Sequence, residues 1–166
     1  MADTHATAAY AFSLERQFEL AAGKNFLTLF NPTSSTRPIT LTAFFASSLA
    51  EVSGVTYPLR GYRISAEPTG GTLHGVDEIC KFDTALKNPV LVVRSGNPSC
   101  TPQAALFSSP VAQQPHDFTS VHEIDAPPGF NPFLIRPGEG LVFRQGFGVT
   151  SNMWNISAIW RELRGT

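Results

Sequence analysis

The sequence predicts an all-β protein built as an antiparallel sandwich or barrel, and three observations lead to this prediction. Short runs in which apolar and polar residues alternate recur along the chain, which is the pattern of half-buried strands. Turn signals made of Pro, Gly and Asn separate these runs at intervals of about eight to twelve residues. No segment has a sustained apolar period of 3.6 residues with a cap and a stop; the best helix candidates, residues 43–52 and 84–87, are weak.

The last third of the chain has the clearest strand pattern. Residues 136–140 (RPGEG) predict a tight turn, residues 141–144 (LVFR) a strand, and residues 152–160 a second strand that alternates between polar and apolar. A pair of tryptophans on one strand face buries a large apolar area. We therefore expect the core face of this last strand to be Trp154, Ile156, Ala158 and Trp160.

Strands are also expected in the first half of the chain. Residues 25–30 (NFLTLF) form one, stopped by Asn31 and Pro32. Residues 39–49 form another, whose apolar face is Ile39, Leu41, Ala43 and Phe45. Phe44 breaks this alternation, which indicates either burial on both faces or a β-bulge.

The middle of the chain is less regular. Residues 55–66 read as a strand, and Pro58 and Gly61 within it predict a sheet edge or a bend. Residues 108–114 read as a loop. Weaker strand candidates bring the expected total to about eight to ten; they are residues 79–82, 90–94, 104–107 and 118–124.

The N-terminus differs in composition from the rest. Residues 1–16 are alanine-rich and predict a short arm, followed by one sandwich domain over residues 17–166. The arm is expected either to fray like an ordinary terminus or to lie as a strand on a partner. In the second case the alternating Tyr10, Phe12 and Leu14 are the candidate assembly contacts.

Composition narrows the function classes. With 166 residues the chain is long enough for one self-sufficient core. Charged residues make up 15%, against the usual ~25%, so either neighbouring molecules cover part of the surface or Ser, Thr and Asn dominate it. The net charge of −1 and the lack of a basic block argue against nucleic-acid binding, and no apolar run is long enough to span a bilayer.

The two cysteines fit a chain that is made and kept in a reducing cytoplasm until assembly. The N-terminus lacks the basic region and apolar stretch of a secretory signal. Cys80 and Cys100 do not have zinc-site spacing and are expected to be free thiols, at least partly buried, although their spacing leaves a disulfide open.

No catalytic, metal or cofactor site is predicted. The histidines, at positions 5, 74, 116 and 122, lack metal-ligand spacing, and His122 and Asp125 would face opposite sides of a strand. Glu123 and Asp125 would share a strand face, which could bring two carboxylates as close together as a glycosidase needs. However, we expect both to be surface acids exposed to solvent. No serine lies in a Gly-x-Ser-x-Gly turn.

Three pieces of sequence, taken in order, carry a resemblance to a known family. The first is residues 26–32 with the Ser/Thr loop that follows; the second is residues 62–64, 70–72 and 81–84; the third is residues 133–141 with the last strand. In this order they resemble small jelly-roll proteins of tailed bacteriophage virions, namely capsid decoration, cement or head-fibre base proteins. The resemblance covers about residues 24–161 and is weakest at the N-terminal arm.

The resemblance implies a jelly-roll sandwich, often a homotrimer, clamped on the capsid exterior against the major capsid protein. It implies no catalytic residue, so no enzyme activity is expected; with the composition, we also expect no cofactor and no nucleic-acid or membrane partner. The alternative is a glycan-binding β-sandwich of a phage head or tail fibre, with a shallow groove lined by aromatic residues such as Tyr57, Tyr62 or Phe147. A small jelly-roll enzyme is the third hypothesis.

Overall fold

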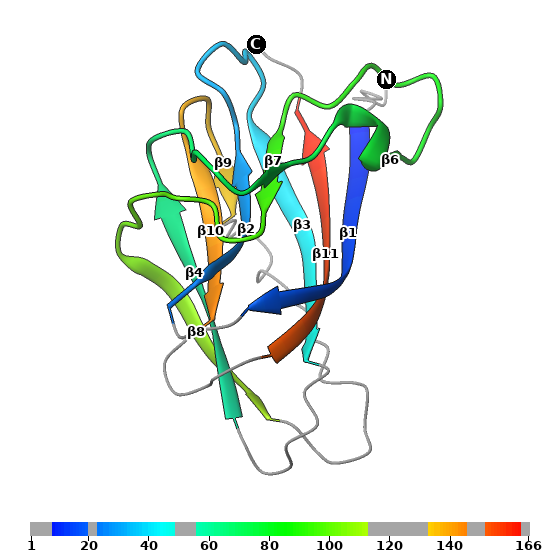
Figure 1. Ribbon diagram of the computed structural model, residues 1–166. Coiled ribbons are helices and arrows are strands. Elements are labelled where there is room, and N and C mark those ends of the chain that lie inside the picture. The colour runs from blue at the N-terminus through cyan, green and yellow to red at the C-terminus, as the bar shows by residue number, and fades with distance from the viewer. Residues whose placement is uncertain (1–7, 20–22, 49–55, 113–132, 146–151, 164–166) are drawn as a thin grey trace, which may run out of the picture.

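The computed structural model of the protein describes residues 8–19, 23–48, 56–112, 133–145 and 152–163. These residues form two antiparallel sheets packed as a sandwich, so the predicted fold class is confirmed (Figure 1). Within these ranges no helix is long and apolar enough to cross a membrane. The elements are β1 (Ala8–Glu19), β2 (Asn25–Phe30), β3 (Ile39–Ser48), β4 (Thr56–Ile64), β5 (Thr72–Leu73), the 3-10 turn η1 (Val76–Glu78), β6 (Cys80–Lys81), β7 (Val92–Ser95), β8 (Ala105–Ala112), β9 (Leu134–Ile135), β10 (Gly140–Gln145) and β11 (Asn152–Glu162).

The strand order shows a nested pattern of pairing. Sheet A has the order β6-β1-β11-β3-β9, and sheet B has the order β5-β7-β2-β10-β4-β8. Four antiparallel pairs enclose one another along the chain: β1 with β11, β2 with β10, β3 with β9 and β4 with β8. This is the pairing of one long hairpin folded over on itself. Its tip is the connection from β4 to β8, residues 65–104, which we call the excursion; it carries β5, β6 and β7.

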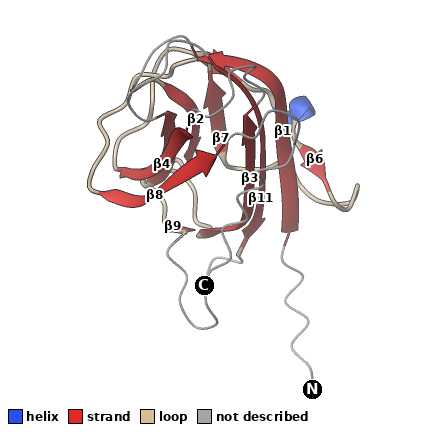
Figure 2. Ribbon diagram, turned by 90° about the horizontal axis from the view of Figure 1, so that it is seen from below, coloured by secondary structure: helices blue, strands red, loops and turns tan. Residues whose placement is uncertain are grey.

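The two sheets face each other (Figure 2), and the core cluster is made of side chains from both. The rings of Phe44 on β3 and Phe143 on β10 join them, with ring centroids 3.8 Å apart. Within sheet A the ring of Tyr10 stacks on Trp160 at 5.9 Å. A smaller cluster lies on the opposite face of sheet B, because successive side chains of a strand point to opposite faces. That cluster consists of Phe30, Ile64 and Val142.

The central strand β11 has the predicted core face where its side chains are described. Ile156, Ala158 and Trp160 are all buried. The side chain of Trp154 lies outside the described part of the chain. Because β11 pairs with β1 on one side and β3 on the other, this face lies in the middle of sheet A.

Strand β3 contains the bulge that Phe44 indicated. Ile159 pairs with Ala43 but Trp160 pairs with Leu41, so Thr42 is an extra residue in β3. Beyond this bulge the inward positions change parity: Phe44 is buried, while Ala43 and Phe45 are only half-buried. The expectation that Ala43 and Phe45 belong to the core face was therefore wrong. The weak helix candidate at residues 43–52 is wrong for residues 43–48, because they belong to β3.

The predicted arm is also corrected, because β1 runs through the expected boundary at residue 16. Residues 8–19 pair with β11 over almost its whole length, so the part of the arm that the structure describes is a strand of the sandwich. The alanine-rich composition favoured an arm here, although the alternation of Tyr10 and Phe12 with smaller residues is the pattern of a strand. Residues 1–7 lie outside the described part of the chain.

Strand β4 shows how the sheet accommodates its proline. Pro58 pairs with Pro110 of β8, while β10 meets β4 only from Leu59 onward. Pro58, which has no N–H, therefore lies where β4 has only one neighbouring strand among the described residues. At Gly61, where the sequence predicts an edge or a bend, the register between β4 and β8 shifts. Residues 108–112 belong to β8, so reading them as a loop was wrong.

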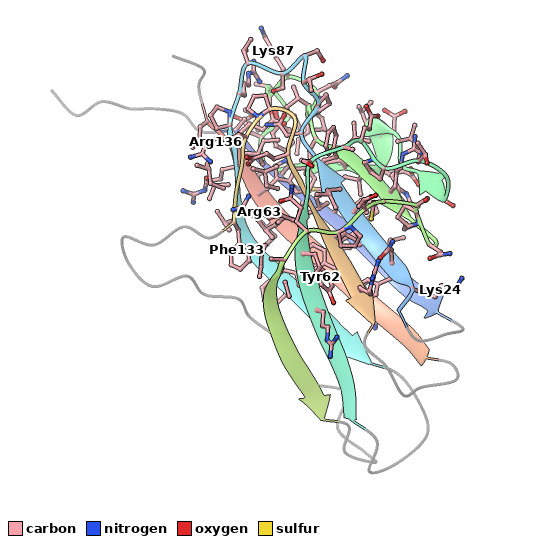
Figure 3. The ribbon with its side chains drawn as sticks, turned by 90° about the vertical axis from the view of Figure 1, so that its left-hand side faces the viewer. Lys24, Tyr62, Arg63, Lys87, Phe133 and Arg136 are labelled. Atoms are coloured by element: carbon pink, nitrogen blue, oxygen red, sulfur yellow. The ribbon has the colours of Figure 1, made fainter. Side chains whose placement is uncertain are left out.

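Two turns that the sequence singled out interlock at one end of the sandwich. The backbone N–H of Asn31 donates to the Glu139 carbonyl at 2.9 Å, and that of Gly138 donates to the Asn31 carbonyl at 2.8 Å. Gly138 has a φ of +82°, a backbone conformation that favours glycine. Arg136 and Lys87 lie at this same end of the molecule (Figure 3).

Candidate functional site

The three candidate assembly contacts are placed in or against the core. Tyr10 and Phe12 are 0% and 2% exposed, and Leu14 is half-buried against the same cluster. The Tyr10 hydroxyl donates to the Lys87 carbonyl at 2.9 Å, and burial, with the charge of Glu162, raises the pKa of that hydroxyl. Tyr10 and Phe12 therefore hold the chain's own strands together and do not present an outer contact surface.

A polar chain of three side chains lies where the excursion meets both sheets. His74 follows β5; its Nε2 lies 2.7 Å from the Ser95 hydroxyl, and its Nδ1 lies 3.2 Å from a carboxylate oxygen of Glu78. The imidazole also packs against the ring of Phe12 in sheet A, with centroids 4.7 Å apart. Sequence reasoning missed this cluster because its members come together only through the β5–β7 pairing.

The order Ser95–His74–Glu78 is that of a serine nucleophile, its general base and the acid that orients the base. Glu78 also accepts from the Gly75 N–H at 2.7 Å, and these two hydrogen bonds lower the pKa of its carboxyl. In the tautomer with the proton on Nδ1, the ring donates to the Glu78 carboxylate and Nε2 accepts from the Ser95 hydroxyl. However, Ser95 is only 3% exposed and faces the core with Val93. The cluster therefore attaches the excursion to the edge of the sandwich, and we call a group of side chains that does this a latch.

A second latch is built on a buried carboxylate. Glu162 at the end of β11 accepts from the Val90 N–H at 2.7 Å and pairs with the Arg37 guanidinium at 3.2 Å. Its side chain is fully buried, whereas that of Arg37 is about one-third exposed. Together with the bond from Tyr10 to Lys87, this carboxylate fixes residues 87–90 of the excursion over the end of sheet A.

A third polar cluster fixes the excursion to the outer face of sheet B. Asn25 is buried, and its amide donates to the Pro98 carbonyl at 2.9 Å and to the Cys100 sulfur at 3.3 Å. Its carbonyl oxygen accepts from Arg144 Nε at 2.8 Å. The Arg144 guanidinium lies over the ring of Tyr62, 5.4 Å from its centroid.

Tyr62, one of three aromatic residues proposed to line a glycan groove, is therefore half-buried beneath Arg144 on β4 (Figure 3). The side chains of Tyr57 and Phe147 lie outside the described part of the chain. Both cysteines are free thiols, as expected. Cys100 is partly buried, and burial raises its pKa more than Arg144 lowers it. Cys80 is exposed, contrary to expectation, because β6 is an edge strand.

The other acidic and histidine side chains lie partly inside and partly outside the described part of the chain. Asp77 and Glu78 are exposed in η1. His5, His116, His122, Glu123 and Asp125 lie outside the described residues. In the ranges that the structure does describe, no three His, Cys, Asp or Glu side chains gather as a metal site would require.

Exposed apolar side chains gather on one segment of the excursion. Leu73, Val76 and Phe82 are 56%, 40% and 60% exposed, and they are the large apolar side chains found exposed among the described residues. All three belong to residues 72–82, which cross from β5 at the edge of sheet B to β6 at the edge of sheet A. We call these residues the edge segment.

Comparison with known proteins does not assign this chain to a family. No family model matches it, and no curated protein and no solved structure matches it either.

Proposed function

We propose that the protein is a structural component of a tailed-bacteriophage virion. It is made in the host cytoplasm, adopts a jelly-roll sandwich and binds as an oligomer to the major capsid protein on the capsid exterior. The nested pairing of four strand pairs supports the proposal, because a jelly roll, an architecture that viral capsid proteins use, would pair its strands in this nested way. The order of the three sequence pieces that resemble phage decoration proteins supports it independently.

The way the described polar side chains are used agrees with a structural role. His74, Glu162 and Asn25 each connect segments of the chain that are far apart in sequence. Such fully bonded polar clusters stiffen a fold. A stiff block with few charges suits a protein that binds many equivalent positions on a shell, where multiple contacts raise the overall affinity.

The test is binding to the shell. The full chain is mixed with empty shells assembled from the major capsid protein encoded in the same genome, and the shells are sedimented. We expect the protein to sediment with the shells at a saturating ratio and to raise the temperature at which they disassemble. Shells of an unrelated phage are the control, and a protein that stays in the supernatant with both kinds of shell contradicts the proposal.

The alternative function is a glycan-binding module of a phage head or tail fibre. It rests on the sequence expectation that Tyr62 lines a groove, and a sugar would stack on the part of the Tyr62 ring that the Arg144 guanidinium leaves uncovered. The test is a glycan array followed by titration of any bound sugar against the Tyr62→Ala variant. Micromolar binding that this variant abolishes, together with no binding to shells, selects the alternative.

A further inference from the structure

The exposed apolar side chains of the edge segment form a concentrated feature. A single exposed leucine or phenylalanine needs no explanation on a protein surface. Here, however, Leu73, Val76 and Phe82 all lie within ten consecutive positions along one edge of the sandwich. A gathering of this kind marks an interaction surface more often than a scatter of the same residues does.

The path of the segment explains why these side chains point outward. The segment closes the gap between the two sheets, so it needs inward side chains that seal the core. His74 and Ile79 fill that role: His74 contacts Phe12 and Ser95, and Ile79 belongs to the core cluster. The positions between and beside these two are left facing solvent.

The segment is also held firmly at both ends. The backbone N–H of His74 donates to the Val93 carbonyl at 3.0 Å, and that of Phe82 donates to the Ala9 carbonyl at 3.2 Å. Lys81 Nζ donates to the Leu86 carbonyl at 3.1 Å. A surface fixed in advance loses little conformational entropy on binding, so its apolar area contributes more fully to affinity.

The charges of this edge indicate what covers it. Asp77 and Glu78 are exposed toward its beginning. Toward and just beyond its end, the half-buried Lys81 and the exposed Lys87 lie on either side of the exposed Asp83, so the net charge there is positive. A partner of uniformly acidic or basic character would meet like charges at one of the two ends. A second copy related by a two-fold axis would instead place the acids of one segment opposite the lysines of the other, since two-fold contacts are self-complementary.

We propose that the edge segment is the contact between two copies of this chain, with Leu73, Val76 and Phe82 of each copy packed against the other and the Asp77 end of each opposite the Lys87 end of its partner. The contact is two-fold and makes a dimer, in place of the trimer that the family resemblance implies. It deepens the proposed function by specifying how the oligomer forms.

The first test measures the mass of the full chain in solution by sedimentation velocity over a concentration series, with a reducing agent present because Cys80 in the segment is exposed. The wild type is expected to dimerise, and Leu73→Asp with Phe82→Asp to raise the dissociation constant at least 100-fold. The matched control places the same two charges at the exposed Ala104 and Ala105 and leaves the dimer intact. A monomeric wild type, or a dimer that the edge variant does not weaken, overturns the proposal.

A charge-swap experiment tests the two-fold arrangement. Asp77→Lys cancels the negative charge of the first end, where Glu78 remains, and Lys87→Asp makes the net charge of the second end negative, so each variant alone loses the attraction between the two ends and dimerises more weakly. Mixing the two variants restores dimers, because every swapped charge then faces an opposite one. Failure of the mixture to exceed either variant alone contradicts the two-fold contact.

Neither experiment uses a shell, so the outcomes are separable from those of the proposed function. A monomeric protein that sediments with shells refutes the dimer alone. A dimer that does not sediment with shells refutes only the decoration role.

Discussion

The nested strands and the excursion are held in place by different forces. Where β10 and β11 pair with their neighbours, long ladders of backbone hydrogen bonds combine with an apolar core. The excursion has strands of only two to four residues, and side-chain hydrogen bonds from Glu162, His74 and Asn25 attach it to the sheets.

The difference teaches which residues stabilise the whole molecule and which stabilise one segment. Removing a side chain from the core between the sheets weakens both sheets at once. Removing a latch in the excursion frees only the segment that it holds, because regions of a protein open with different free energies.

The largest effect is expected in the core. Trp160→Ala removes the largest fully buried side chain and its stacking on Tyr10, so we expect a loss of about 3–5 kcal/mol in the free energy of unfolding. Chemical denaturation followed by circular dichroism measures it. Trp160→Phe is the control and is expected to cost less, because the tryptophan Nε1 has no hydrogen-bond partner. Equal losses for both variants contradict this explanation.

Glu162→Gln tests the buried latch of the excursion. The amide cannot match the charged bond with Arg37, and its NH₂ group has to face either the Val90 N–H or the Arg37 guanidinium, both of which are donors, so the expected cost is about 2–3 kcal/mol. Hydrogen exchange should show faster exchange at Val90 and its neighbours than in β10. Uniformly faster exchange throughout both sheets would contradict the division between local and global stabilisation.

Gly140→Ala tests how tightly the nested strands approach each other at the β9–β10 turn. A Cβ at this position lies 2.6 Å from the Leu29 carbonyl oxygen and 2.9 Å from Ile64, so we expect a loss of about 2 kcal/mol. Gly75→Ala in the excursion is the matched control: nothing lies within 4 Å of its Cβ. The melting temperatures of the two variants give the comparison, and a larger loss at Gly75 would contradict it.

The smallest expected effect is the pH dependence of the hydrogen bonds that join Glu78 to His74 and Gly75. The carboxyl of Glu78 has a folded-state pKa below its ordinary value of 4.5, because it accepts from Gly75 and His74. Its contribution is therefore complete above that ordinary value and is lost as pH falls through the lower, folded-state pKa. The protection factors of residues 74–79, which correct for the slower intrinsic exchange at low pH, should fall in the wild type as the pH is lowered through that pKa. Glu78→Gln should show fast exchange at neutral pH already, and an unchanged rate would contradict the latch.

The parts of the fold that could be predicted are those in which local pattern and tertiary burial coincide. The face of Ile156, Ala158 and Trp160 was predictable because β11 lies in the middle of its sheet and alternates without interruption. The interlocked turns at Asn31 and Gly138 were visible because proline and glycine mark chain reversals. Phe44 signalled a bulge, but only the register with β11 placed it at Thr42.

The candidate contacts were less predictable. Tyr10 and Phe12 were assigned to an outer arm because alanine-rich composition outweighed their alternation, and the structure places them in the core. Leu73, Val76 and Phe82 show no sequence pattern that separates them from core residues. Their exposure follows from the crossing between two sheet edges, which is a property of the folded chain.

The amino-acid sequence by itself determined that this protein is an all-strand sandwich, because alternation of apolar residues and the placement of turn residues act within a few positions of each other. The tertiary structure alone decided that β1 belongs to the sandwich, that Glu162 and His74 fasten the excursion, and that the edge segment faces solvent. Each of these depends on partners that are distant along the chain: Ala8 pairs with Glu162, and Glu162 accepts from Val90. No local pattern encodes such neighbours.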